Sequence, residues 1–356
     1  MIERLQFALN RIRERLWVKP LLVCLVSVLG VLLASVADGT GLGDVVPDVS
    51  KDSLESLLKI VAASMLVMAT FAVGSMVSAY ASASGSATPR AFTLVIADDV
   101  SQNTLSTFVG VFIFSIVALL ALMNDYYDRA GRFALFVLTA LVFALVIVAF
   151  VRWVDSIARL GLLGNTIKKV EAATLASLEL RRVAPRLGGV ARTAPRTGGR
   201  SVTSGTIGYV QMVDTATLQE RAEASGLRAM VAALPGAFCT PDRPVATVTT
   251  DGSGEVSDDD VAALAEAFRV GPNRTFDHDP RFGLVVLSEI ASRALSPAVN
   301  DPGTAIDVTG SLVRLFAAWV APPDEAPEVR FDRVAVPTLS VDDLFDDAFT
   351  GIASDG

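Results

Sequence analysis

One stretch near the C-terminal end of the chain concentrates the residue types that could bind a ligand or do chemistry. Residues 274–308 read RTFDHDPRFGLVVLSEIASRALSPAVNDPGTAIDV and include the protein's only histidine. Asp279-Pro280 and Asp301-Pro302 each open a predicted helix, because aspartate is a good N-cap and proline fits the first helical position. Two helix N-termini placed close together would present unpaired N–H groups and positive dipole ends, which suit an anion.

Polar side chains of this stretch form a candidate ligand or interface site. The candidates are Arg274, His278, Asp279, Arg281, Arg293, Asn300, Asp301 and Thr304. A simpler interpretation stays open beside it. The aspartates could serve only as local caps, and the two helices could serve only to pack the domain.

The chain offers no pattern typical of an enzyme. No serine or cysteine nucleophile motif accompanies His278, and one histidine among aspartates is a weak metal-ligand set. No phosphate-binding or dinucleotide-binding glycine loop is present, and neither Cys24 nor Cys239 lies in a CxxC motif. We therefore expect no catalytic residue, no metal, no cofactor and no nucleic-acid partner.

The elements around the candidate site predict a mixed domain over residues 206–356. Two helices are expected at 280–295 and 302–320, joined by the tight connection SPAVNDPG. The remaining predicted strands are 206–213, 227–234, a strand that ends near 250, and 329–336, and the remaining helices are 215–224, 257–268 and 340–349. This region carries ten basic and 24 acidic residues, a net charge of −14, which is typical of a solvated α+β domain in the cytosol.

The N-terminal part of the chain has a different character. Four long apolar runs cover residues 17–37, 57–80, 105–123 and 133–151, and the mean hydropathy of the whole chain is +0.51. Each run reaches the ~18–20 residues that a helix needs to cross ~30 Å of hydrocarbon. We predict a transmembrane domain of four helices over residues 17–154. Its first run is expected to be a retained helix, because no clear signal-cleavage site follows it.

Charges around the runs predict their orientation. The flank 1–16 is basic, the loop 38–56 is mostly acidic, and basic residues return after the fourth run. By the positive-inside rule both termini are expected in the cytoplasm of a multi-pass inner-membrane protein, with short outer loops at 38–56 and 124–132.

Residues 155–205 are expected to connect the two parts. Their start, 155–182, has helical periodicity that could continue the fourth span, and 185–205 is rich in Gly, Pro, Ser and Arg, as linkers are. Residues 161–205 carry eight basic and two acidic side chains, a net charge of +6. This charge either sets topology alone or also attracts anionic lipid, at ~1 kcal/mol for each basic side chain.

Small and hydroxylated residues recur in the second run. Thr70, Gly74, Ser78 and Ser82 are spaced four residues apart and form a predicted helix ridge. Such a ridge permits close helix packing, and its hydroxyls could alternatively line a pathway. No run has a charge at its centre, which argues against a proton relay but not against a passive channel. The loop 89–104 carries Arg90, Asp98 and Asp99, where the C-terminal domain could contact them.

Three stretches carry a resemblance to a known family. They are TPRAFTLVIADDVSQNTLSTFVGVFIFSIVAL (88–119), GYVQMVDTATL…PGAFCTPDRPVATV (208–248) and GPNRTFDHDPRFGLVVLSEIASRALSPAVNDPGTA (271–305). The last resembles the signature of a bacterial family of predicted integral membrane proteins, domain-of-unknown-function family 2254. Its matching positions are Arg274, Thr275, Asp279, Pro280, Phe282, Gly283, Ala291, residues 293–297, Asn300, Asp301, Pro302, Thr304 and Ala305.

The resemblance has two departures. His278 stands where the family pattern has glutamine, and relatives look longer than a chain that ends at GIASDG. The resemblance implies four spans and a cytosolic domain, and it implies no activity.

Two functional hypotheses follow. The first is a homo-oligomeric channel-like or membrane-sensing assembly regulated by its cytosolic domain. Copies are needed because four short-looped helices rarely enclose a pathway. The second is a membrane-tethered ligand-binding module or protein-interaction scaffold without transport activity.

Overall fold

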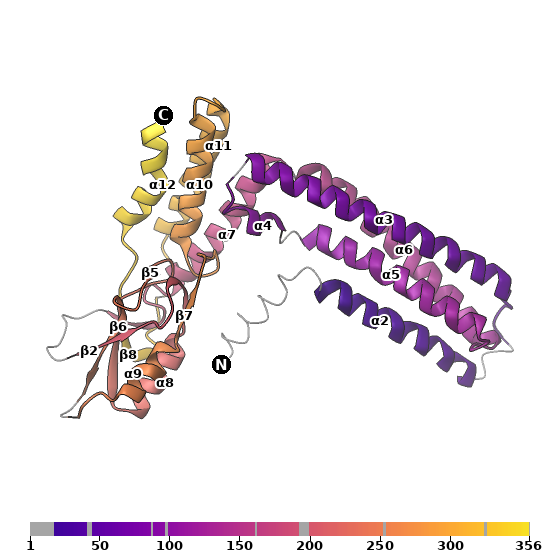
Figure 1. Ribbon diagram of the computed structural model, residues 1–356, viewed down its shortest axis with the longest axis horizontal. Coiled ribbons are helices and arrows are strands. Elements are labelled where there is room, and N and C mark those ends of the chain that lie inside the picture. The colour runs from indigo at the N-terminus through magenta and orange to yellow at the C-terminus, as the bar shows by residue number, and fades with distance from the viewer. Residues whose placement is uncertain are drawn as a thin grey trace. The chain divides into compact units, whose positions relative to one another are not determined.

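The computed structural model describes residues 18–40, 45–86, 88–96, 99–160, 162–191, 199–251, 254–323 and 326–355 of the chain (Figure 1). The chain divides into two compact units. The span unit comprises the described residues up to 86 together with residues 92–165. The helix-and-sheet unit comprises residues 88–91 and 166–356. Each unit is described by itself below.

The span unit is helical throughout its regular structure. Its elements are α2 (Val18–Ala34), the short 3₁₀ helix η1 (Ser35–Thr40), α3 (Lys51–Ser86), α4 (Phe92–Ile96), α5 (Asp99–Met123) and α6 (Arg129–Leu160). Four segments are long and apolar enough to cross a membrane: Val18–Gly39, Lys51–Ser82, Val100–Met123 and Arg129–Arg159. They correspond to the four predicted runs. Most of the helices extend beyond those runs, because a helix continues wherever its backbone hydrogen bonds continue and does not stop where hydropathy falls.

Helix α5 is the centre of the span unit, with α2, α3 and α6 packed against it. The side chains of Leu58, Phe114 and Leu135 are fully or almost fully buried between these helices. The outer surfaces are apolar as well. In the apolar 18-residue stretches of Val18–Gly39 and Arg129–Arg159, only 11% and 17% of the residues are buried. A surface of exposed Leu, Val and Phe over four helices is costly in water and favourable in lipid.

The two loops expected on the outer side lie together at one end of the span unit. Asp38 accepts hydrogen bonds from the backbone N–H groups of Asp128 and Gly131 at 3.1 and 2.6 Å, which satisfies donors at the start of α6. The Nζ atom of Lys51 lies 2.5 Å from a carboxylate oxygen of Asp125. The structure therefore joins 38–56 and 124–132, as the prediction of a shared side requires.

The helix-and-sheet unit contains two sheets. The five-stranded sheet has the order β1 (Gly189–Ala191), β8 (Phe331–Val336), β4 (Leu227–Val231), β6 (Pro244–Thr250), β2 (Arg200–Thr203). Its β1–β8 and β4–β8 pairs are parallel, and its β4–β6 and β2–β6 pairs are antiparallel. The three-stranded sheet is antiparallel, in the order β5 (Phe238–Cys239), β3 (Gly208–Val213), β7 (Phe268–Gly271).

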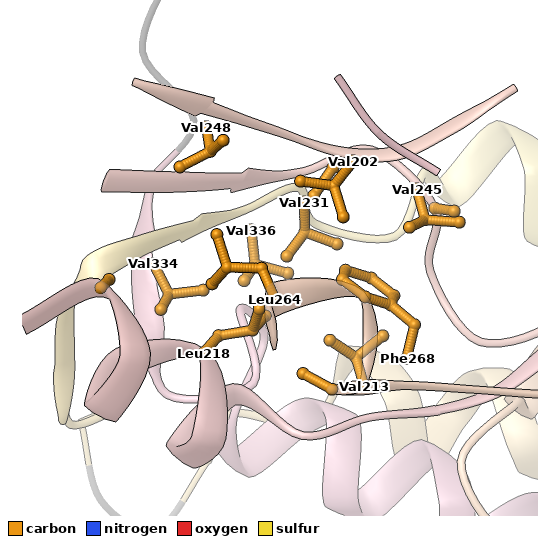
Figure 2. Packing of buried hydrophobic residues seen from close by; sticks show 14 of the residues in the cluster. Val202, Val213, Leu218, Val231, Val245, Val248, Leu264, Phe268, Val334 and Val336 are labelled. Carbon is orange, nitrogen blue, oxygen red and sulfur yellow. The ribbon is translucent and has the colours of Figure 1, made fainter. Parts of the chain in front are cut away.

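Valine-rich strands build the core of this unit. One face of the five-stranded sheet packs against α8 (Thr215–Ala224), α9 (Asp258–Ala265) and strand residues of the smaller sheet (Figure 2). β-Branched valines favour strands because their stiff side chains pack well on a pleated surface. Figure 2 shows Val202, Val231, Val245, Val248, Val334 and Val336 from the large sheet meeting Leu218, Leu264, Val213 and Phe268.

Four further helices complete the unit: α7 (Leu163–Val183), α10 (Pro280–Leu295), α11 (Pro302–Val320) and α12 (Val341–Asp355). Helices α11 and α12 both pack on α10, which is buried along most of its length. The bounds of α10 and α11 are those predicted from the Asp-Pro starts. The capping box of α9 is also present, with Ser257 and Asp260 in reciprocal hydrogen bonds.

The predicted linker at 185–205 requires a correction, because two of its segments are strands. Residues 189–191 form β1 and residues 200–203 form β2, while 192–198 lie outside the described residues. Their local composition of Gly, Arg and Ser is that of a loop. Pairing with β8 and β6, which lie far along the chain, is what makes them strands. Strands β5 and β7 are also absent from the predicted set, and the helix predicted over 257–268 ends at Ala265.

The predicted continuation of the fourth span into the next helix also differs. Helix α6 ends at Leu160 and α7 begins at Leu163. The backbone N–H groups of Leu162 and Asn165 donate to the carbonyls of Arg159 and Leu162 in turns between them.

Candidate functional site

The start of α10 is the centre of the candidate site. Asp279 is the N-cap: its carboxylate accepts from the backbone N–H of Phe282 at 3.2 Å, and Pro280 occupies the first turn. The aspartate is only 1% exposed. A buried carboxylate needs compensation beyond the cap, because its desolvation cost is large.

Arg274 supplies that compensation. Its Nε and Nη2 atoms donate to the two carboxylate oxygens of Asp279 at 2.7 and 3.1 Å, a bidentate pair. The guanidinium lies over the ring of Phe282, 5.2 Å from its centroid, and that ring packs on Phe276. Burial raises the pKa of Asp279 from its ordinary value, and the hydrogen bonds from Arg274 oppose the rise.

The turn that precedes β5 closes over the same carboxylate. Gly236 has φ +93°, and a Cβ at this position would lie 2.3 Å from a carboxylate oxygen of Asp279. Only glycine fits, for both conformation and space. Nearby, the side-chain amide of Gln211 donates to the carbonyl of Asn273 at 2.7 Å. The stretch 208–248 and the signature 271–305, which are far apart in the sequence, thus build one site.

Arg181 of α7 belongs to this site and was missed as a site residue. It is 3% exposed, and burial lowers its pKa to about 10, an effect that the charge of Asp279 partly offsets. Within the described part of the chain, its Nη1 and Nη2 atoms are buried and have no hydrogen-bond acceptor. Arg181 belongs to the buried face of α7, which also includes Val170, Thr174 and Leu178.

A signal for Arg181 was present in the sequence. Positions 167, 170, 174, 178 and 181 recur at helical spacing, so the arginine lies on the apolar face of α7. By composition alone it is one of the eight basic residues of 161–205. The close approach of α7 to α10 fixes this face, since a Cβ on Gly283 would lie 1.9 Å from the hydroxyl of Thr174.

The second Asp-Pro start is in a different place. Asp301 is exposed and caps α11 locally, accepting from the backbone N–H of Thr304 at 3.1 Å and from its hydroxyl at 2.6 Å. That hydroxyl lowers the pKa of Asp301. The backbone N–H of Asp301 donates to the carbonyl of Ala294 near the end of α10. Asn300 before it has φ +50°.

The two helix starts therefore do not converge. They lie near opposite ends of α10, whose 16 residues span roughly 24 Å at about 1.5 Å per residue. The prediction of one anion cradle between both starts is corrected accordingly. The physical reason is the tight connection, which places the start of α11 beside the end of α10.

The other candidates are also separated. Arg281 is paired with α12, where its Nε lies 2.5 Å from Asp347 and its Nη1 lies 2.8 Å from Asp343. Arg293 is exposed in the last turn of α10, and His278 is half-buried beside Asp279 in the sequence. From the predicted set, the structure brings Arg274 to Asp279 at the start of α10, and Thr304 to Asp301 at the start of α11.

The described residues include a groove but no cluster of metal ligands. Among residues whose placement is described, no group of three His, Cys, Asp or Glu side chains could hold a metal ion. An open groove of about 470 Å³ lies instead beside β7, lined by residues that include Ser204, Met212, Glu266 and Arg269.

The predicted ridge of the second span faces outward. Thr70, Gly74, Ser78 and Ser82 are all exposed on α3. A Cβ added to Gly74 would meet nothing within 4 Å, and the hydroxyl of Thr70 donates to the carbonyl of Leu66 in its own helix. The ridge is therefore not used to pack the four helices of one chain.

Residues 88–91 lie between α3 and α4 in the sequence but belong to the helix-and-sheet unit. Arg90 forms an ion pair with Glu289 of α10. Of the acidic residues predicted in this loop, Asp98 lies outside the described residues.

Comparisons with known proteins indicate a membrane protein. Residues 13–356 match the family described as "Predicted membrane protein (DUF2254)". Uncharacterized proteins of Mycobacterium bovis and of two strains of Mycobacterium tuberculosis are 37% identical to it over 130 residues, which is 35% of this chain. The aligned part covers 24% of the length of each relative, and no solved structure matches. Since the family match covers nearly the whole chain, the protein belongs to this family of predicted membrane proteins, DUF2254.

Proposed function

We propose that the protein is one subunit of a homo-oligomeric, channel-like or membrane-sensing assembly of the bacterial inner membrane. Its four spans cross the bilayer, and both termini and the helix-and-sheet unit face the cytoplasm. The observation that carries the proposal is the outward ridge of Thr70, Gly74, Ser78 and Ser82 on α3. Small residues on a lipid-facing helix allow a helix of another copy to approach closely.

The ridge explains why copies are needed. The four helices of one chain bury Phe114, Leu135 and other large side chains between them, and the buried hydroxyls of Ser115 and Thr139 donate to carbonyls of their own helices. A pathway would therefore form between subunits, where the hydroxyls of the ridge would replace some of the water around a solute. Exposed basic residues of 161–205, such as Lys168, would hold the assembly against anionic lipid.

The ion pair between Arg90 and Glu289 supports regulation by the helix-and-sheet unit. Arg90 is only a few residues from α3 and from α4, so a change in α10 acts on the segment that joins the second and third spans. Such a link is the kind of discrete contact through which one unit biases another.

Flux through liposomes tests the proposal. Purified protein in vesicles should pass small solutes or ions under voltage or membrane tension, and Gly74→Leu should abolish flux and the contact between copies through the α3 ridge. The matched control is Val73→Leu, which changes an exposed position on another side of the same helix. Flux that persists in Gly74→Leu, or wild-type protein that is silent under voltage and tension, would overturn it.

A second candidate function is the binding of a small anion by the helix-and-sheet unit, with no transport. It rests on Arg181, a buried guanidinium whose Nη1 and Nη2 atoms lack an acceptor in the described structure. Asp279 is already engaged by both bonds from Arg274, so the buried cluster of two arginines and one aspartate has an excess positive charge. A carboxylate or phosphate would supply the missing acceptor after a small opening of α7 from α10.

A thermal-shift screen separates this candidate from the first. Phosphate, sulfate and simple carboxylates should raise the melting temperature of the wild type, and Arg181→Met should remove the rise. Arg293→Met removes an exposed arginine of the same unit and should leave it unchanged. Equal responses of both variants would attribute the rise to general ionic effects and reject the site.

A further inference from the structure

Helix α11 has an apolar stripe that no part of the described chain covers. Ile306, Val313 and Val320 are 71%, 59% and 76% exposed, although the opposite face of the helix is buried in the unit. Gly310 and Ala317 fall between them, half-buried and exposed respectively. The five positions follow each other at intervals of four and three residues, which is the spacing of a coiled-coil seam. We call them the α11 seam.

We propose that the α11 seam pairs antiparallel with the same seam of a second copy of this chain. The proposal deepens the proposed oligomer by naming a surface outside the spans, and the contact itself does not depend on conduction. A two-fold pair must be self-complementary, because the same patch serves both partners. The sequence of α11 meets this condition in one register.

In that register every layer joins a large side chain to a small one. The three layers, each formed twice, pair Ile306 with Ala317, Gly310 with Val313, and Gly303 with Val320 of the second copy. A parallel pairing would set Gly310 against Gly310 and leave a void, and voids between helices cost stability. The alternation of sizes along α11 therefore favours the antiparallel arrangement.

Charges beside the seam agree with it. Asp307 and Arg314 lie on the same flank of α11, seven residues apart. In the antiparallel register, Asp307 of each copy comes beside Arg314 of the other copy. Arg314 is held on this flank by Glu171, whose carboxylate oxygens lie 2.6 and 2.7 Å from its Nε and Nη2 atoms. Two symmetric pairs of opposite charge would thus border the apolar layers.

The size of the surface indicates a modest affinity. A helix of 19 residues is roughly 28 Å long, and one helix pair buries less than the ~1,600 Å² of a standard interface. Two exposed residues at the end of α7, Leu180 and Val183, enlarge this apolar surface. They lie near the end of α11, because Arg182 between them donates to the carbonyls of Ala321 and Pro322. Copies held in one membrane have a high effective concentration, which makes a contact of this size sufficient.

Paired cysteines test the register. Ile306→Cys and Ala317→Cys are introduced separately into two differently tagged full-length chains, both with Cys24→Ser, and are co-expressed in membranes. Oxidation or a short bis-maleimide should link Ile306→Cys of one copy to Ala317→Cys of the other. Each variant alone should not link to itself, because the two like positions are 11 residues apart along the axis, roughly 16 Å.

Controls distinguish the possible outcomes. Val341→Cys on α12 is an exposed position outside the seam and should give no cross-link. Gly310→Leu should abolish the mixed cross-link while the melting temperature is unchanged. Cross-linking of Ile306→Cys with itself would show a parallel pair, and the absence of the mixed product would reject the surface; both results overturn the proposal.

A last comparison keeps this inference separate from the proposed function. The mixed cross-link should persist when Gly74→Leu disrupts the α3 ridge, because the α11 contact is pairwise and lies in the other unit. A protein that forms the cross-link but conducts nothing would reject the channel and keep the α11 pair. A conducting protein without the cross-link would reject the α11 pair and keep the channel.

Discussion

The two Asp-Pro helix starts use the same local chemistry in two opposite environments. Asp279 and Asp301 both accept from a backbone N–H three residues later, and each is followed by proline. Asp279 is buried under a glycine turn and paired with Arg274, whereas Asp301 is exposed and its carboxylate accepts from Thr304 of its own helix. The cap is a property of four residues, but the role of the carboxylate is set by what packs over it.

The largest effect is expected when Asp279 is changed to alanine. The variant loses the cap and leaves Arg274 and Arg181 buried without their counter-charge, which costs about 3–5 kcal/mol of the free energy of unfolding. Urea unfolding of the full chain in detergent measures it, followed by the fluorescence of Trp319 in a Trp17→Phe/Trp153→Phe background. Asp279→Asn separates the two losses, since asparagine caps as well as aspartate but carries no charge.

A second prediction compares the glycines beside the two caps. Gly236→Ala forces a methyl group against the carboxylate of Asp279 and into a left-handed backbone, so we expect a loss of about 1–3 kcal/mol. Gly303→Ala brings a Cβ to 3.3 Å from the carboxylate of Asp301, which is exposed and free to shift. Alanine also favours a helix over glycine, so no loss is expected there. Equal losses at both positions would contradict the contrast.

The same contrast shows how far the sequence leads. Helix bounds at 280–295 and 302–320 could be predicted because caps and prolines act within a few residues. The bidentate contact of Arg274 with Asp279 is also local. The contributions of Gly236 and Arg181 could not be predicted as parts of one site, because they depend on how β5 and α7 pack on α10 from far along the chain.

The span unit was more predictable than the sheets. A run of apolar residues encodes a span by itself, as the four segments show. Strands β1, β2 and β7 each have three or four residues and are defined only by their partners. In strands as short as these, local composition does not distinguish a strand from a loop.

A third prediction concerns Asp301 alone. Asp301→Ala should lower the melting temperature slightly, by the loss of one exposed cap, and Asp301→Asn should lower it less because asparagine also caps but carries no charge. Differential scanning fluorimetry of the full chain in detergent measures both. A fall for Asp301→Asn as large as that for Asp279→Asn would show that the second start also depends on its charge.

The smallest expected effect is a difference in pH dependence between the two starts. The pKa of Asp301 is lowered, so its stabilising ionised form contributes above the unfolded value of about 3.8 and is lost as pH falls through the lowered pKa. Burial raises the pKa of Asp279, so the folded state holds that proton more tightly, and stability declines as pH rises from about 3.8 through the raised value.

The two asparagine variants should therefore diverge in opposite directions. Between pH 3 and 6, the melting temperature of the wild type minus that of Asp301→Asn should grow with pH, whereas the wild type minus Asp279→Asn should shrink over the same range. Arg293→Met is a suitable control, because it changes a charge of the unit that neither cap contacts in the bonds described for them. Parallel slopes for the two variants would mean that the environment of Asp279 does not disfavour its charge, and that burial and pairing there cancel.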